Sequence, residues 1–134
     1  MMTFLQGMGD LGKTTVAALA ISREDVRRHF HGGIAWIKIG QQKLGSTANF
    51  DGISSSLSYG NFMYHIRTIC LQLRVTLPHF SEIVFLPGDD AHIREEKTRQ
   101  AMEKAHVKMC YLLGGMSVLL VLDDLWHFPD AEWF

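Results

Sequence analysis

Residues 7–14 read Gly7-Met8-Gly9-Asp10-Leu11-Gly12-Lys13-Thr14. The stretch matches the phosphate-binding motif G-x-x-x-x-G-K-[ST], whose glycines let the backbone turn tightly and point its N–H groups at anionic oxygens. In such a loop the lysine, here Lys13, contacts the β- and γ-phosphates, and the threonine, here Thr14, offers its hydroxyl to Mg²⁺. A helix that begins at this point directs the positive end of its dipole at the same anion.

The residues on either side of the motif predict the order of strand, loop and helix that a phosphate loop requires. Residues 2–6 are typical of a short buried strand, and residues 15–30 predict one helix with Val16, Leu19 and Ala20 on the side that faces a sheet. The alternative is a glycine turn with no ligand. The flanking strand and helix favour the phosphate loop.

Four further segments are predicted from their composition and spacing. Residues 34–39 are β-branched and aromatic and predict a strand with Trp36 in the core. Residues 41–60 are rich in Gly, Ser, Asn and Gln, which predicts a long surface loop or insertion. Apolar residues at helical spacing predict helices over residues 61–73 and from about residue 91 to Leu113.

Two pairs of aspartates stand at element boundaries. Asp89 and Asp90 precede the second of these helices, where N-capping explains them better than a metal site does. Residues 117–122 form an unbroken apolar run, as expected for a parallel strand that is covered on both faces, and the run ends in Asp123-Asp124. The predicted fold class is therefore α/β with a mostly parallel sheet.

Asp123 and Asp124 lie at the carboxyl end of a strand, where ligands gather in open α/β sheets. An aspartate at the end of a buried strand supplies the Mg²⁺ partner that a phosphate loop needs. In isolation, an aspartate that merely caps the strand is the better explanation. Beside Lys13 and Thr14, the metal-binding role is favoured.

Composition limits the classes of function. The chain has 134 residues, enough for one domain, with 13 basic and 14 acidic residues, so no electrostatic attraction to nucleic acid or to an anionic membrane is expected. The apolar run at residues 109–122 is too short to span a bilayer. Two cysteines without a C-x-x-C pair fit reduced thiols, so we expect a cytoplasmic protein.

Three motifs together resemble the NB-ARC domain, the STAND-class P-loop NTPase of plant disease-resistance proteins and animal apoptotic protease-activating factors. They are the stretch from Gly7 to Thr15, the Gly-Gly-Ile-Ala-Trp-Ile stretch at 32–37, and the Leu-Leu-Val-Leu-Asp-Asp-Leu-Trp stretch at 119–126. The resemblance covers nearly all of residues 1–134, with 41–60 as an insertion. It implies a three-layer P-loop NTPase fold, represented here by the N-terminal part of the domain.

The resemblance also implies a site for ADP or ATP with Mg²⁺, which makes an adenine nucleotide the expected partner. Thr14 and Asp123 would hold the metal, and Asp124 would orient or deprotonate the attacking water, with slow ATP hydrolysis at most. Asp10 departs from the small residue that is usual there, and a carboxylate beside phosphates weakens binding unless it points to solvent. The implied phosphate-binding residues are Gly7, Met8, Gly9, Asp10, Leu11, Gly12, Lys13, Thr14 and Thr15.

In the family, later strands complete the sheet, including the central strand between the phosphate-loop strand and the acidic strand. We therefore expect an incomplete sheet in this chain, in which unpaired buried N–H and C=O groups each cost about 1 to 3 kcal/mol. On this expectation the chain by itself is at best marginally stable. Self-association is expected only in a full-length protein.

Two alternative functions stay open beside the nucleotide-binding switch. A P-loop phosphotransferase needs an acceptor pocket and a lid with arginines, and neither is identified in the sequence. A truncated remnant keeps the motifs, but its site cannot assemble. A GTPase is disfavoured because the sequence has no Asn-Lys-x-Asp guanine motif.

Overall fold

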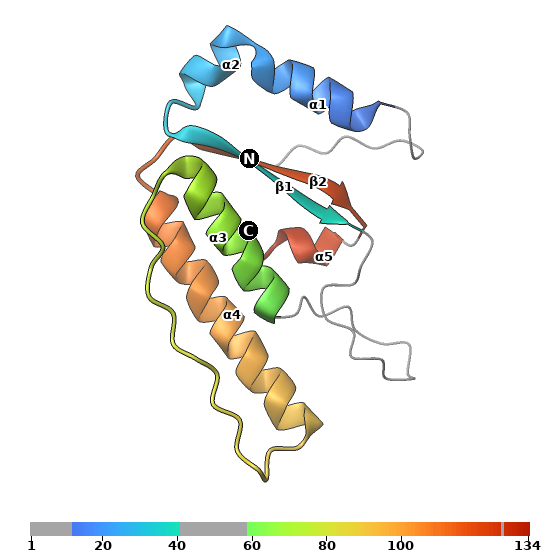
Figure 1. The fold of residues 1–134 in the computed structure, drawn as a ribbon, viewed down its shortest axis with the longest axis vertical. Coiled ribbons are helices and arrows are strands. Elements are labelled where there is room, and N and C mark those ends of the chain that lie inside the picture. Colours follow the sequence, from blue (N-terminus) through green and yellow to red (C-terminus); the bar gives the residue numbers. More distant parts are fainter. Residues whose placement is uncertain (1–11, 41–58, 127) are drawn as a thin grey trace.

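The computed structural model describes residues 12–40, 59–126 and 128–134 (Figure 1). The predicted strand at 2–6 lies outside these residues, as does the predicted loop up to residue 58. The elements follow in the order α1 (Lys13–Ser22), α2 (Glu24–His29), β1 (Gly33–Gly40), α3 (Tyr59–Leu73), α4 (Ala91–Leu113), β2 (Val118–Leu125) and α5 (Phe128–Ala131).

The two described strands, β1 and β2, pair in parallel, as the sequence predicted for a buried apolar run. Their register runs from Gly33 opposite Val118 to Gly40 opposite Leu125. Figure 1 shows α1 and α2 on one side of this pair and α3, α4 and α5 on the other. The described part of the chain thus has a small parallel sheet with helices, an arrangement compatible with an incomplete α/β domain.

The core lies between the sheet and α3. Alternate residues of β1 are buried there, while α3 buries the face that its helical spacing predicted, and α4 packs behind α3. The buried core consists of Ala35, Ile37, Ile39, Phe62, Met63, Ile66, Ile69, Cys70, Leu73, Met102, Ala105 and Met109.

The predicted N-cap of α4 is confirmed. A side-chain oxygen of Asp90 accepts a hydrogen bond from the backbone N–H of Ile93 at 2.8 Å. Asp89 accepts from the backbone N–H of Leu86 and pairs with Lys97, and these two partners lower the pKa of the Asp89 carboxyl. Both carboxylates therefore organise the start of α4.

The single helix predicted over residues 15–30 is wrong, because the chain forms two helices that meet at Arg23. Arg23 is extended, with φ −66° and ψ 138°, and it occupies the N-cap position of α2. At the end of α1, the Ser22 hydroxyl donates to the carbonyl of Ala18, a local bond of the kind that bends helices. Two acidic residues in the first turn of α2 then stabilise a new helix start through the helix dipole.

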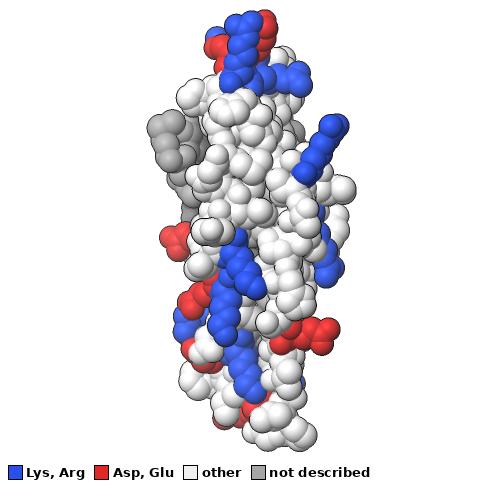
Figure 2. All heavy atoms as spheres, turned by 90° about the vertical axis from the view of Figure 1, so that its left-hand side faces the viewer, with Lys and Arg blue, Asp and Glu red and all other residues white. Residues whose placement is uncertain are grey.

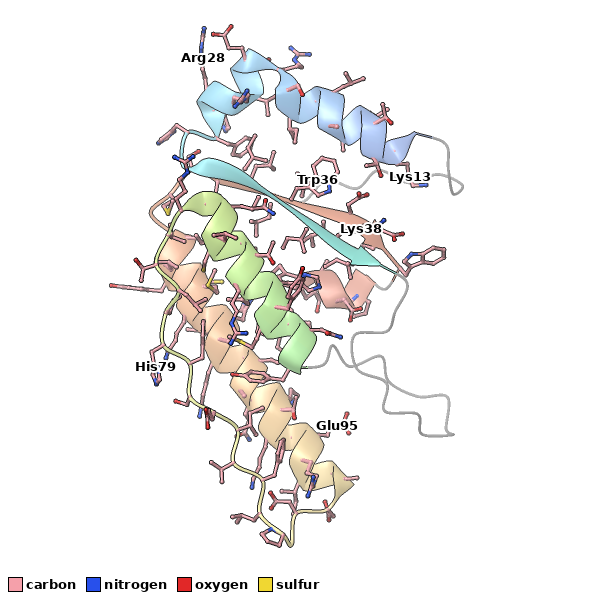
Figure 3. The ribbon with its side chains drawn as sticks, in the orientation of Figure 1. Lys13, Arg28, Trp36, Lys38, His79 and Glu95 are labelled. Carbon is pink, nitrogen blue, oxygen red and sulfur yellow. The ribbon has the colours of Figure 1, made fainter. Side chains whose placement is uncertain are left out.

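The predicted packing of α1 against the sheet is also wrong. No residue of α1 is buried, and the side chains of Val16 and Leu19 are 52% and 65% exposed. Trp36, expected in the core, is only half-buried, with its ring between the sheet and α1 (Figure 3). The side of the sheet that faces α1 is therefore much less closely packed than the side that faces α3.

One backbone edge of β1 is covered by a side chain from α3. The amide of Gln72 accepts from the N–H of Trp36 at 2.7 Å and donates to the carbonyl of Trp36 at 2.9 Å. These two bonds imitate the pairing of a further strand at one residue. The N–H and the C=O of a strand residue point to the same edge of the strand. The Trp36 groups bound by Gln72 therefore lie on the edge of β1 that faces away from β2.

Acidic and basic side chains are interspersed on the surface. Figure 2 shows Lys and Arg beside Asp and Glu over α2 at the top and along the lower half of this face. Examples are the pairs Arg28–Glu24 on α2, and Arg99–Glu96 and Arg99–Glu103 on α4. None of the helices in the described ranges combines the length and apolar character needed to cross a bilayer.

The C-terminal residues pack against α3 through aromatic rings. The Phe134 ring lies 5.6 Å from that of Phe62 and 5.8 Å from that of His65, measured between centroids. The side chain of His65 is buried and its Nδ1 has no hydrogen-bond partner, so burial lowers the pKa of His65 below 6.5. A proton on this ring would have to be held in an apolar setting.

Replacing Gln72 with alanine should expose the edge of β1 to local opening. We expect the amide proton of Trp36 to exchange about tenfold faster, since the loss of about 1.4 kcal/mol is typical when such a bond is removed. Amide hydrogen exchange measured by NMR reports this residue directly. The matched control is Gln100→Ala on α4, and unchanged exchange at Trp36 in Gln72→Ala would contradict the bond.

The stability of the fold should fall as the pH is lowered below about 6.5. The unfolded chain binds a proton at His65 at a higher pH than the folded chain does, so acid favours unfolding from about pH 6.5 down to the lowered folded pKa. Urea unfolding followed by circular dichroism between pH 5 and 8 measures the slope. The slope should flatten in His65→Leu and persist in the control His92→Leu, whose histidine is exposed on α4.

Candidate functional site

The start of α1 meets the end of β2 through one hydrogen bond. The hydroxyl of Thr14 donates to Oδ1 of Asp123 at 2.9 Å, across 109 positions of sequence. Lys13 directly precedes Thr14, and Figure 3 shows it above the end of the sheet toward which the strand arrows point. The fold therefore brings together Lys13, Thr14 and Asp123, which the sequence had assigned to one site.

The backbone at the start of α1 has the form of a helix N-terminus without a side-chain cap. Gly12 has φ +76°, a left-handed conformation that an L side chain disfavours, and it occupies the N-cap position without any side-chain cap. The first intrahelical bond runs from the N–H of Val16 to the carbonyl of Gly12 at 2.8 Å. The preceding N–H groups thus have no acceptor within the helix, and the first turn contains no acidic residue that would compete for them.

The two aspartates at the end of β2 have different environments. Asp123 is half-buried, and its Oδ1 also accepts from the backbone N–H of Asp124 at 3.0 Å. Asp124 is exposed and left-handed, with φ +57°, a conformation that aspartate tolerates better than most residues. Its Oδ1 accepts from the indole N–H of Trp126 at 2.8 Å.

The oxygens of Thr14 and Asp123 fit magnesium. Two neighbouring ligands of octahedral Mg²⁺, each about 2.1 Å from the metal, lie about 3 Å apart, and the observed separation is 2.9 Å. Among the described residues, no cluster of three His, Cys, Asp or Glu side chains forms a metal cage. Two protein oxygens suit a metal that keeps several waters and binds phosphates.

The phosphate-binding residues predicted from the sequence are described only in part. Gly12, Lys13, Thr14 and Thr15 lie at the start of α1. The predicted ligands Gly7, Met8, Gly9, Asp10 and Leu11 lie outside the described residues. The roles assigned to Asp123 as a metal ligand and to Asp124 in catalysis stay predictions, with the positions of both side chains now known.

The sequence analysis missed two residues beside the site. Lys38 is the register partner of Asp123 in the β1–β2 pair, and Trp126 binds the carboxylate of Asp124. Lys38 is the only charged residue between Gly33 and Gly40, and this was the signal in the sequence that could have identified it. Trp126 ends the 119–126 stretch that carries the NB-ARC resemblance, but its bond to Asp124 could not be read from the sequence because it depends on the turn after β2.

Two hollows of the described part lie away from this site. One, of about 680 Å³, is formed by residues 76–78 and the C-terminal half of α4, and it is mainly apolar. The other, of about 470 Å³, lies beside Trp36 at the amino end of β1 and reaches Ile21 and Arg27. Neither hollow is lined by Thr14, Asp123 or Asp124. The candidate site is therefore defined by its hydrogen bonds and by the start of α1.

The family model of the NB-ARC domain matches residues 1–59 of this chain. The resemblance inferred from the sequence is therefore confirmed for the N-terminal part, which includes the phosphate-loop motif, α1, α2 and β1. No curated protein and no solved structure matches the chain. Asp123 and Asp124 lie beyond the matched residues, and the bond from Thr14 connects them to the matched part.

The left-handed backbone of Asp124 makes its substitutions unequal. Asp124→Ala should lower the free energy of unfolding by about 1 to 2 kcal/mol, because alanine disfavours positive φ and cannot accept from Trp126. Asp124→Asn should change it by less than about 0.5 kcal/mol, since asparagine tolerates the conformation and keeps an acceptor. Urea unfolding followed by circular dichroism measures both variants, and equal losses would contradict this geometry.

Proposed function

We propose that this chain is an adenine-nucleotide-binding module of a signalling P-loop NTPase and that it binds ADP or ATP together with Mg²⁺. Three observations support the proposal: the complete phosphate-loop motif at residues 7–14, the NB-ARC match over residues 1–59, and the contact between Thr14 and Asp123. The last carries the most weight. It connects the phosphate-loop motif with the aspartate at the end of β2, and the two oxygens are 2.9 Å apart, which suits two ligands of one metal ion.

Each described residue has a proposed role that follows from its chemistry. Lys13 neutralises the phosphates, and the uncapped N–H groups at the start of α1 bind phosphate oxygens. Thr14 and Asp123 would supply two oxygens to Mg²⁺, and the metal would help to neutralise the negative charge of the phosphates. The proposed glycine-loop ligands are Gly7, Met8, Gly9, Asp10, Leu11, Gly12 and Thr15.

Asp124 is the proposed group for orienting an attacking water, with slow hydrolysis of ATP at most. Its exposed carboxylate is already engaged by Trp126, so one of its oxygens has a fixed position. Two reduced thiols, Cys70 and Cys110, are compatible with the cytoplasm that we propose as the location.

Equilibrium dialysis of the 134-residue chain against ADP and Mg²⁺ tests the proposal. Lys13→Ala should weaken binding about 10- to 100-fold, because it removes a charge-assisted contact with phosphate. The matched control is Lys104→Ala, which removes an exposed lysine of α4 and should leave binding unchanged. Circular dichroism verifies that both variants are folded like the original chain.

The same dialysis experiment also tests the proposed binding of Mg²⁺. Binding of ADP by the original chain should be tighter with Mg²⁺ than with EDTA, and Asp123→Asn should remove most of this difference. A chain that binds neither ADP nor ATP, or a Lys13→Ala variant that binds as well as the original, would exclude the nucleotide site. It would instead favour the remnant whose site cannot assemble.

A further inference from the structure

Lys38 stands on the side of the sheet that carries the proposed nucleotide site. Its Cα is paired with that of Asp123, and paired residues of neighbouring strands direct their side chains to the same face. The Asp123 carboxylate accepts from Thr14 at the start of α1, so this shared face is the one turned toward α1. Figure 3 shows the ring of Trp36, two residues earlier in β1, on the same face.

The alternation of burial along β1 leads to the same placement. Ala35, Ile37 and Ile39 are buried on the side of α3, whereas Lys38 between them is exposed. The core therefore does not contain Lys38, and its charged side chain belongs to the face of the sheet that is turned toward α1.

Among the described residues, no carboxylate forms an ion pair with the ammonium group of Lys38. This includes Asp123, which lies opposite Lys38 in register. Oδ1 of Asp123 instead accepts from the Thr14 hydroxyl and from the Asp124 N–H. None of the described acidic groups therefore competes with a bound anion for the cation at the carboxyl end of β1.

We propose that Lys38 binds the terminal phosphate of a bound nucleoside triphosphate and thereby favours a triphosphate over a diphosphate. This inference rests on the proposed nucleotide-binding function. A metal held by Thr14 and Asp123 would help to neutralise the phosphates, so the terminal phosphate would be bound near Asp123. Lys38 comes from the strand adjacent to Asp123, and its four-carbon stem lets the ammonium group reach across to that phosphate.

The proposal gives the two lysines separate tasks. Lys13 is at the start of α1 and serves both nucleotides, because the phosphate loop holds the phosphates that they share. Lys38 comes from the strand paired with that of Asp123 and would meet only the additional phosphate of the triphosphate. Removing Lys38 should therefore change the ratio of the two affinities, whereas removing Lys13 should lower both.

Isothermal titration calorimetry with ADP and with a non-hydrolysable ATP analogue, each with Mg²⁺, tests this assignment. Lys38→Met keeps the length of the stem and removes the charge, so affinity for the ATP analogue should fall about tenfold while affinity for ADP stays within about twofold. Lys38→Arg should retain most of the preference. The matched control Lys104→Met should alter neither affinity.

The outcomes separate this inference from the proposed function. If the original chain binds neither nucleotide, both are overturned. If it binds both and Lys38→Met leaves the affinity ratio unchanged, only the role of Lys38 is overturned. Mg²⁺ binding can also be titrated in the presence of each nucleotide. If Lys38→Met strengthens Mg²⁺ binding equally with both nucleotides, the proposed role of Lys38 is overturned, because Lys38 would then act on Asp123 and the metal.

Discussion

The parallel pairing of β1 with β2 is the constraint on which the described structure depends. Parallel strands cannot be joined by a tight turn, so the chain between them must cross over, and here that connection contains α3 and α4. The crossover supplies the core, because α3 covers the alternate apolar residues of β1 and α4 packs behind it. The same pairing brings the carboxyl ends of both strands to one edge, where Asp123 and Lys38 become neighbours.

The two faces of this sheet differ in packing and polarity. The side facing α3 is closely packed and fixes the register, since a shift by one residue would turn Ala35, Ile37 and Ile39 away from the core. On the side facing α1, the described residues at the end of the sheet are polar and include Thr14, Lys38 and Asp123. The apolar face thus supports a polar face that carries the proposed ligand chemistry.

The proposed site is built from few protein groups. A helix start without a side-chain cap, one threonine hydroxyl and one strand-end carboxylate lie within hydrogen-bond reach of one another, and Asp124 follows in a left-handed turn fixed by Trp126. None of these groups is a site by itself. Their combination at one edge of a parallel sheet, together with the NB-ARC match, supports a site for phosphate and magnesium.

By itself the sequence determined those helices, strands and caps whose formation depends on residues close together in the chain. The helical spacing of residues 61–73, the Asp90 cap and the apolar strand before Asp123 were all predicted, because burial periodicity and capping act within a few residues. The phosphate-loop motif predicted phosphate and metal roles for Lys13 and Thr14, and these roles stay predictions. The break at Arg23 was missed, because a charged run is compatible both with one continuous helix and with a new helix start.

Only the tertiary structure decided which residues meet across long stretches of chain. The bond from Thr14 to Asp123 spans 109 positions, and the pairing of Lys38 with Asp123 depends on a strand register that no local pattern encodes. The exposure of Val16 and Leu19 was likewise invisible in the sequence, since apolar spacing shows which face of a helix can be buried but not whether another element covers it.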